Sequence, residues 1–246
     1  MAWTTPVHPS LDPILSNSSR NFHLNPLLSE FKVLIMPNRW GRAPVFLQST
    51  FLKMSEKNNR VSQYGVEEMF LDRWSSRSFS PKKIDQEQIN QLFEAAHWAP
   101  SSGNRQPWRF VYATDGENRK KFNSVLYDSN AMWAPKAPML ILVFAETKNE
   151  EGNNIRTGMF DTGAAWMSLA LQANRMGLNS RAMGGIDLEA AYEAAGVPKD
   201  RFTAICAIAV GYRGTDEDIH PRMVKNNFAN DRKELSEIAF KEQFQS

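Results

Sequence analysis

The hydrophobic pattern of the chain becomes regular only from Met54 onward. Residues 139–146 and 203–212 form two nearly continuous apolar runs, which are typical of strands buried on both faces. Residues 109–114 alternate between polar and apolar side chains, as the residues of a half-buried strand do. The pattern therefore predicts three strands.

Apolar residues at helical spacing fill most of the sequence around these strands. We predict helices at residues 61–74, 85–99, 115–128, 158–176 and 188–198. The second has the clearest boundaries, because Asp85 and Gln88 have capping-box spacing and Pro100 follows the last turn. Apolar residues, Phe160 among them, nearly encircle the fourth, so we expect a central buried helix. Helices alternating with apolar strands favour an α/β or α+β sandwich around one sheet.

Residues 1–53 differ from the rest of the chain, being rich in Pro, Ser and Asn with no sustained period. We interpret them as a mostly disordered extension before a domain of residues 54–246. Two alternatives stay open: a transit peptide, since basic residues outnumber acidic ones there, or a natural start at Met54. The C-terminal stretch 232–244 is either a short helix or an arm.

Composition narrows the classes of partner. The 246 residues carry a formal net charge of +2, which gives no general attraction to nucleic acid or membrane. The single cysteine, Cys206, excludes an intramolecular disulfide and a multi-cysteine metal centre, and its apolar surroundings predict a small buried residue. No apolar run approaches the ~18 residues of a membrane-spanning helix. We expect a cytoplasmic protein that binds no metal, nucleic acid or membrane.

The stretch "RWSSRSF" at residues 73–79 is the first candidate for chemistry. In an extended segment, the side chains of Arg73, Ser75 and Arg77 point the same way. Two guanidinium groups and a hydroxyl on one face make a plausible clamp for a phosphate or carboxylate. A solvated loop is the alternative.

Three further polar or glycine-rich stretches interrupt the apolar elements. The loop "APSSGNRQPWRF" at residues 99–110 concentrates hydroxyl, amide and backbone N–H groups, and is either a ligand-binding loop or a rigid connection. The stretch "RAMGGID" at 181–187 lets a flat ligand approach the backbone, or simply turns before a helix capped by Asp187. The basic tail "HPRMVKNNFANDRK" either binds an anion or is solvated. No GxGxxG, GxSxG or HExxH motif occurs.

Taken in order, these stretches resemble the FMN-dependent nitroreductase family. The resemblance adds "MLILVFAE", "DTGAAWMSLALQANRMGLNSRAMGGID", "AICAIAVGYRG" and a C-terminal arginine, and it extends over about residues 62–240. It implies an α+β fold: a three-layer α/β/α sandwich with a central mixed, mainly antiparallel sheet. It also implies a homodimer that binds FMN at its interface.

Site residues follow from the resemblance by position. It implies that Arg73, Ser75 and the backbone of Trp74 contact the FMN phosphate, and that Arg77 reaches the N1–O2 edge of the flavin. Arg232 is implied as a further phosphate ligand.

The same resemblance implies roles for the loop and the glycine pair. Ser101, Ser102 and Asn104, in a loop shaped by Pro100, would contact the FMN of the partner subunit. The backbone of Gly184 and Gly185 would lie against the flavin ring, with the Gly185 N–H directed at N5. Asn130 matches an asparagine at the flavin edge.

Two positions depart from the family pattern. Many members have Glu where this chain has Gly184, and Asn230 takes the place of a lysine, for which Arg222 or Lys225 could compensate.

The implied activity is hydride transfer from NAD(P)H through flavin N5 to nitroaromatic, quinone or similar acceptors, in a ping-pong cycle. A reductive dehalogenase, a flavin-destroying enzyme of cobalamin biosynthesis and a non-catalytic FMN-binding protein are the alternatives. The short segment "TKNEEGNNIRTG" at residues 147–158 argues against the large lid of the specialised enzymes.

Overall fold

The computed structural model describes residues 58–245, so the predicted extension over residues 1–53 and its boundary lie outside the described residues. The strands are β1 (Trp108–Ala113), β2 (Met139–Glu146), β3 (Leu178–Met183) and β4 (Phe202–Tyr212). The helices are α1 (Glu68–Asp72), α2 (Gln86–His97), α3 (Gly116–Ser124), α4 (Asp128–Ala131), α5 (Gly158–Arg175), α6 (Leu188–Ala195) and α7 (Pro221–Val224). Short 3-10 turns lie at Ser102–Asn104, Ala134–Lys136, Asp216–Asp218 and Leu235–Glu237.

The four strands form one antiparallel sheet in the order β1-β2-β4-β3. β2 is central: Leu140, for example, lies opposite Ala113 of β1 and opposite Ala209 of β4. β3 pairs with the other edge of β4. The α+β class is confirmed, whereas the parallel pairing of a mixed sheet is not found among residues 58–245.

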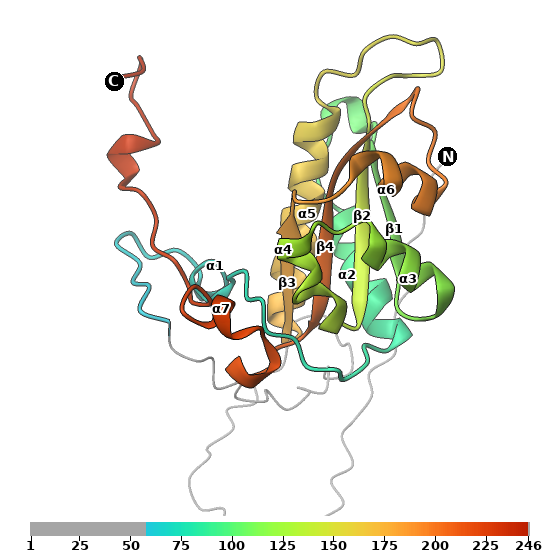
Figure 1. Cartoon of the computed structure of the whole chain (residues 1–246). Helices are drawn as coiled ribbons and strands as arrows, with labels where there is room; N and C mark the ends of the chain where they lie inside the picture. The colour runs from blue at the N-terminus through green and yellow to red at the C-terminus, as the bar shows by residue number, and fades with distance from the viewer. Residues whose placement is uncertain (1–57, 246) are drawn as a thin grey trace, which may run out of the picture. The chain divides into compact units, whose positions relative to one another are not determined.

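Side chains of β2 alternate between two hydrophobic cores. Met139, Ile141 and Val143 pack with buried residues of α2 and α5, and Leu140 and Leu142 pack with buried residues of α3 and α6. Figure 1 shows α3, α4 and α6 in front of the sheet and α2 behind it. A strand covered on both faces must be apolar at every position, which explains the continuous run and confirms the three-layer sandwich.

The predicted helices differ in how well their bounds agree with those in the structure. Asp85 Oδ1 accepts a hydrogen bond from the Gln88 backbone N–H at 2.8 Å, and the Gln88 side chain accepts one from the Asp85 N–H at 3.3 Å, so the capping box is confirmed. The helix predicted over 61–74 is wrong in its first part, because Gly65 adopts a left-handed φ of +74° and only Glu68–Asp72 is helical. The helix predicted over 115–128 ends at Ser124.

α5 is not buried all round within one chain. Ala165 and Leu169 are fully buried, but Phe160 is 80% exposed and Met159 is 52% exposed. The apolar composition of this helix therefore has two causes: one face packs in the core, and the other carries apolar side chains into solvent. No helix within residues 58–245 combines the length and apolar character needed to cross a membrane.

β3 was missed because its sequence, LNSRAM, lacks an apolar alternation. Its polar side chains are compatible with a strand since it lies at the edge of the sheet. After α7 the chain is an arm with one short turn at Leu235–Glu237, and Figure 1 shows it leading away from the sheet.

Candidate functional site

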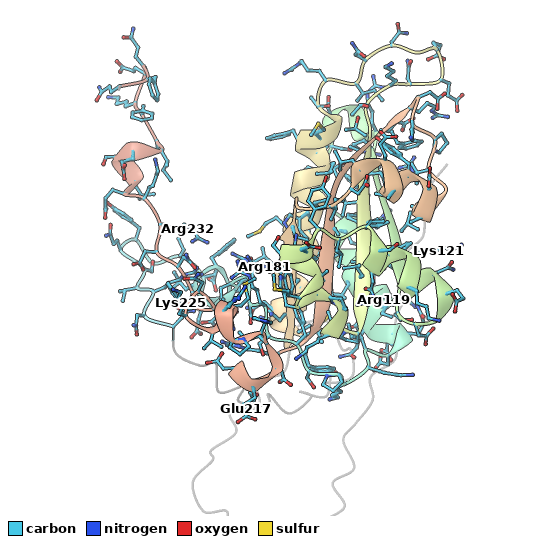
Figure 2. All side chains as sticks on the ribbon, in the orientation of Figure 1. Arg119, Lys121, Arg181, Glu217, Lys225 and Arg232 are labelled. Carbon is cyan, nitrogen blue, oxygen red and sulfur yellow. The ribbon has the colours of Figure 1, made fainter. Side chains whose placement is uncertain are left out.

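A pocket of about 530 Å³ lies where four distant segments of the chain meet. Its lining consists of Arg60, Arg73, Trp74, Ser75, Arg77, Arg181, Asn226, Phe228, Asn230 and Arg232. Five of these residues are arginines, and none of the lining residues is acidic. Figure 2 shows Arg181 and Arg232 on the side where the C-terminal segment leaves the sheet, away from Arg119 and Lys121 on α3. This lining favours an anionic ligand, and we call the site the basic pocket.

The RWSSRSF segment reaches this pocket in the alternating manner that its sequence predicts. Arg73, Ser75 and Arg77 all line the pocket, whereas Ser76 and Ser78 are buried. Arg73 ends α1 and has an extended backbone, with φ −67° and ψ 118°. In an extended segment, alternate side chains point to the same side. The three side chains thus share one pocket within a single chain, as the alternation predicts, and the anion clamp itself stays a prediction.

Asn227 holds the segment against the C-terminal arm. Its Oδ1 accepts hydrogen bonds from the backbone N–H of Arg77 at 2.7 Å and from Ser76 Oγ at 3.3 Å. Arg77 Nη1 also donates to the Asn226 carbonyl at 3.1 Å. These bonds bring the arm, with Arg232, to the pocket.

Sequence reasoning missed Arg60 and Arg181. Arg181 belongs to the RAMGGID stretch, in which no sequence pattern indicates that its side chain reaches the pocket. Its Nη1 donates to the Ser75 carbonyl, and its guanidinium lies 5.5 Å from the Trp133 ring. Arg60 precedes every motif and no pattern marked it. Arg222 and Lys225, considered as replacements for the lysine at position 230, do not line the pocket.

The arginines of the pocket destabilise one another's charge. Burial lowers the pKa of Arg73, and the positive charges of Arg232 and Arg60 lower it further. Burial lowers the pKa of Arg181 to about 10, with an additional contribution from Arg77. A bound anion would favour the charged form of both side chains, because it supplies the opposite charge and hydrogen-bond acceptors.

An unpaired hydrogen-bond donor of Arg73 also favours an anionic ligand. Arg73 Nε is buried and has no hydrogen-bond partner, although Arg73 Nη1 contacts Ser75 Oγ at 3.5 Å. Leaving such a donor unpaired costs about 1–3 kcal/mol, and more for a charged group. The residues present therefore fit a phosphate, whose oxygens accept several charge-assisted hydrogen bonds.

The glycine pair follows directly after β3. Gly185 accepts hydrogen bonds at its carbonyl from the Tyr127 backbone N–H at 3.1 Å and from Asn130 Nδ2 at 2.9 Å. A Cβ at Gly185 would lie 2.7 Å from Asn130 Nδ2, so any other residue there would displace the Asn130 side chain. A Cβ at Gly184 would meet nothing within 4 Å. Asn130 thus supports the glycine backbone; whether it also lies at a flavin edge stays a prediction.

The loop with Ser101, Ser102 and Asn104 lies between α2 and β1, and its residues do not line the basic pocket. Its backbone is held by the buried Asp161, whose Oδ2 accepts from the Ser102 N–H at 3.1 Å. Asn104 has a φ of +55° and Gln106 one of +50°, a strained conformation for residues other than glycine. Pro100 is exposed before this loop.

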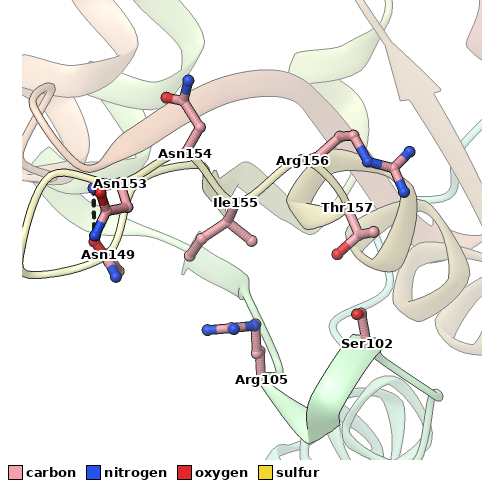
Figure 3. A pocket seen from close by; sticks show the side chains of 8 residues that line it. All are labelled: Ser102, Arg105, Asn149, Asn153, Asn154, Ile155, Arg156 and Thr157. Atoms are coloured by element: carbon pink, nitrogen blue, oxygen red, sulfur yellow. Dashed lines mark hydrogen bonds between the residues drawn. The ribbon is translucent and has the colours of Figure 1, made fainter.

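A second pocket, of about 300 Å³, lies beside this loop and is shown in Figure 3. Ser102 points toward Thr157, while Arg105 and Arg156 are directed away from each other. The two guanidinium groups do not converge on one point, so this pocket is a weaker anion site than the basic pocket.

Other chemistry finds little support in the described part of the chain. No group of three or more His, Cys, Asp or Glu residues suited to a metal ion occurs within residues 58–245. Cys206 is partly buried in β4, and burial raises the pKa of its thiol to about 12, so it is a poor nucleophile.

Comparison with known proteins gives a consistent result. The sequence model of the nitroreductase family matches residues 71–132 and 127–212, more than half of the chain. A crystal structure described as an oxidoreductase containing FMN is 36% identical, with a TM-score of 0.73, and the match covers 78% of this chain and 99% of that one.

Two curated relatives add detail. An Archaeoglobus fulgidus protein named as an NADH dehydrogenase/NAD(P)H nitroreductase is 29% identical over 156 residues, covering 62% of this chain and 87% of the relative. A 5,6-dimethylbenzimidazole synthase from Rhodospirillum rubrum is 44% identical over only 55 residues, 22% of this chain and 26% of that protein.

The basic pocket predicts stabilisation by a simple anion. Inorganic phosphate should raise the melting temperature above that in sodium chloride of equal ionic strength, by the equivalent of about 2.7 kcal/mol at a hundredfold excess over its dissociation constant. Arg73→Gln should abolish most of this rise, whereas Lys121→Gln, on α3, should retain it. Equal loss in both variants, in a thermal melt, would show that phosphate acts on the general charge of the protein.

Proposed function

This chain belongs to the nitroreductase family, and we propose that it is an FMN-dependent oxidoreductase that passes a hydride from NAD(P)H to nitroaromatic, quinone or similar acceptors by a ping-pong mechanism. The observation that carries the proposal is the pocket of five arginines without an acidic lining residue. Its volume of about 530 Å³ lies within the range of small-molecule sites. The 36% identical protein of known structure contains FMN, which supplies an anion of the required kind.

Arg73, Arg232 and Ser75 have N–H or O–H groups that can bind a phosphate. Arg73 has an unpaired Nε, and Arg232 Nη1 donates to the backbone carbonyls of Asn230 and Asp231 on its own arm. Both can turn their N–H groups to a phosphate, with the Ser75 hydroxyl as a further donor. A phosphate carries a charge of about −2, so it neutralises most of the charge of this pair.

Arg77 has a different part in the proposal. Bound FMN would supply N5, the atom at which a hydride from NAD(P)H is taken up and from which it is given to the acceptor. The guanidinium of Arg77 is fixed by Asn226 at the same pocket, and a fixed cation favours the negative charge that reduction places on the N1–O2 edge. NAD(P)H would leave as NAD(P)⁺, and the acceptor would take the hydride together with a proton from water, so the proposal needs no protein base.

We infer that a second copy of the chain completes the site. The basic pocket and the loop of Ser101, Ser102 and Asn104 are separate in one chain, although the family resemblance assigns both to one FMN site. The exposed apolar face of α5, with Phe160 at its start, is the kind of surface that a homodimer covers. The strained but well-anchored loop agrees with a binding role across that interface.

A specialised relative is the second candidate, on the strength of the local match to a 5,6-dimethylbenzimidazole synthase. Against it, the segment between β2 and α5 is a short excursion closed by a bridge between Lys148 and Asn154, with no room for a large lid. Loss of the flavin when reduced FMN is exposed to oxygen on the enzyme would favour this candidate.

The proposed activity predicts a yellow protein that oxidises NAD(P)H when a nitroaromatic compound or a quinone is added. The measurement is steady-state loss of nicotinamide absorbance with each cofactor and a panel of acceptors. Parallel lines in double-reciprocal plots are expected of a ping-pong cycle. A bound flavin that neither NADH nor NADPH reduces would contradict the proposal.

The two arginines of the RWSSRSF segment should differ in their effects on FMN binding and on the reduction potential of the flavin. Arg73→Ala should weaken FMN binding about ten- to a hundredfold, as expected for loss of hydrogen bonds to a charged group. Arg77→Ala should in addition lower the two-electron reduction potential by about 30 mV for each ~1.4 kcal/mol of lost stabilisation. Flavin titration and potentiometry measure the two effects, and identical potentials in the two variants would remove the assigned role of Arg77.

A further inference from the structure

The guanidinium of Arg60 donates hydrogen bonds to backbone carbonyl groups. Its Nη1 donates to the carbonyls of Leu71 at 3.1 Å and Arg73 at 3.0 Å. Its Nε and Nη2 donate to the carbonyl of Asn230 at 2.9 and 2.7 Å. One side chain thus joins two segments that lie far apart in the sequence.

The two segments joined are the ones that carry the phosphate-binding arginines. The Arg73 carbonyl belongs to the residue whose side chain enters the pocket, and Asn230 is two residues before Arg232. Arg232 Nη1 also donates to the Asn230 carbonyl at 3.2 Å, so this oxygen accepts hydrogen bonds from both Arg60 and Arg232. Nearer the start of the arm, Asn226 and Asn227 form the other attachment, to Arg77 and Ser76.

Asn58 reinforces the position of Arg60. The Arg60 backbone N–H donates to Asn58 Oδ1 at 3.0 Å, and Asn58 Nδ2 donates to the Leu71 carbonyl at 2.9 Å. The Leu71 carbonyl is therefore held by both side chains. This small network holds the guanidinium at the edge of the pocket, even though burial and the charge of Arg232 lower its pKa.

We propose that Arg60 is a positioning residue for the phosphate end of the cofactor site, a latch that fastens the C-terminal arm so that Arg232 faces Arg73 across the pocket. The inference rests on the proposed FMN function. It goes beyond it because Arg60 precedes the region that matches the family, residues 71–212. A guanidinium suits this task and an ammonium does not, since only the planar fork can reach three carbonyls at fixed angles.

The test compares Arg60→Lys and Arg60→Gln with the full-length wild-type chain. Both variants should bind FMN about tenfold or more weakly, because both lose the bridge between the segments. Their affinity for riboflavin, which lacks the phosphate, should stay unchanged. Flavin fluorescence on titration with apoprotein gives both affinities, and amide hydrogen exchange should quicken at residues 228–232.

The control is Arg222→Gln, an exposed arginine on α7 that does not line the pocket and should leave both affinities unchanged. Wild-type affinity for FMN in Arg60→Lys would overturn the proposal, since it would mean that the charge alone matters. Equal weakening of FMN and riboflavin would overturn it too. If Arg60→Gln fails to fold, the lysine variant carries the test, because it keeps the charge and most of the stem. Failure of the wild-type chain to bind either flavin would instead refute the proposed function.

Discussion

The organisation of this chain depends on one electrostatic constraint: several guanidinium groups share a partly buried pocket that contains no acidic lining residue. Arg73 is partly buried and lies near the charges of Arg232 and Arg60, and both effects lower its pKa. Such an arrangement costs free energy, so it persists only where the surrounding structure holds the charged groups in place. The buried serines, Asn227 and the Arg60 bridge are the groups that do so.

The fold explains how these residues come together. The antiparallel sheet and its two helical layers form a scaffold whose central strand is buried on both faces. β3, at the edge of the sheet, brings Arg181 to the pocket and then leads to Gly184 and Gly185. The phosphate end and the glycine pair are thereby connected by one short strand, with Arg181 bonded to the Ser75 carbonyl.

Much of the scaffold could be predicted from the sequence, because burial imposes a pattern. The strand at 139–146 and the helix capped by Asp85 were predicted well since apolar runs and capping spacing are local signals. β3 carries no apolar alternation because an edge strand need not be apolar, and the early helix is shorter than its apolar spacing predicts because Gly65 adopts a left-handed conformation. In each case a local conformation or a position in the sheet decided the outcome, not periodicity.

The candidate site was predicted in part, for a related reason. Alternation in an extended segment placed Arg73, Ser75 and Arg77 correctly on one face. Arg60 has no such signal, since its partners are backbone carbonyls whose positions depend on the whole fold. The role of Asn130 beside Gly185 likewise becomes visible only when the two segments are in contact.

The central claim is that the arginines of one chain and the loop of Ser101, Ser102 and Asn104 of a second chain form one FMN site. The most direct measurement is the flavin content of a doubly tagged heterodimer, in which one protomer carries Arg73→Ala and the other carries alanine at the three loop positions. Each homodimer should lose its flavin, while the heterodimer should regain one undamaged site and hold half the wild-type FMN per chain. A heterodimer with no more flavin than its parent homodimers would contradict a shared site.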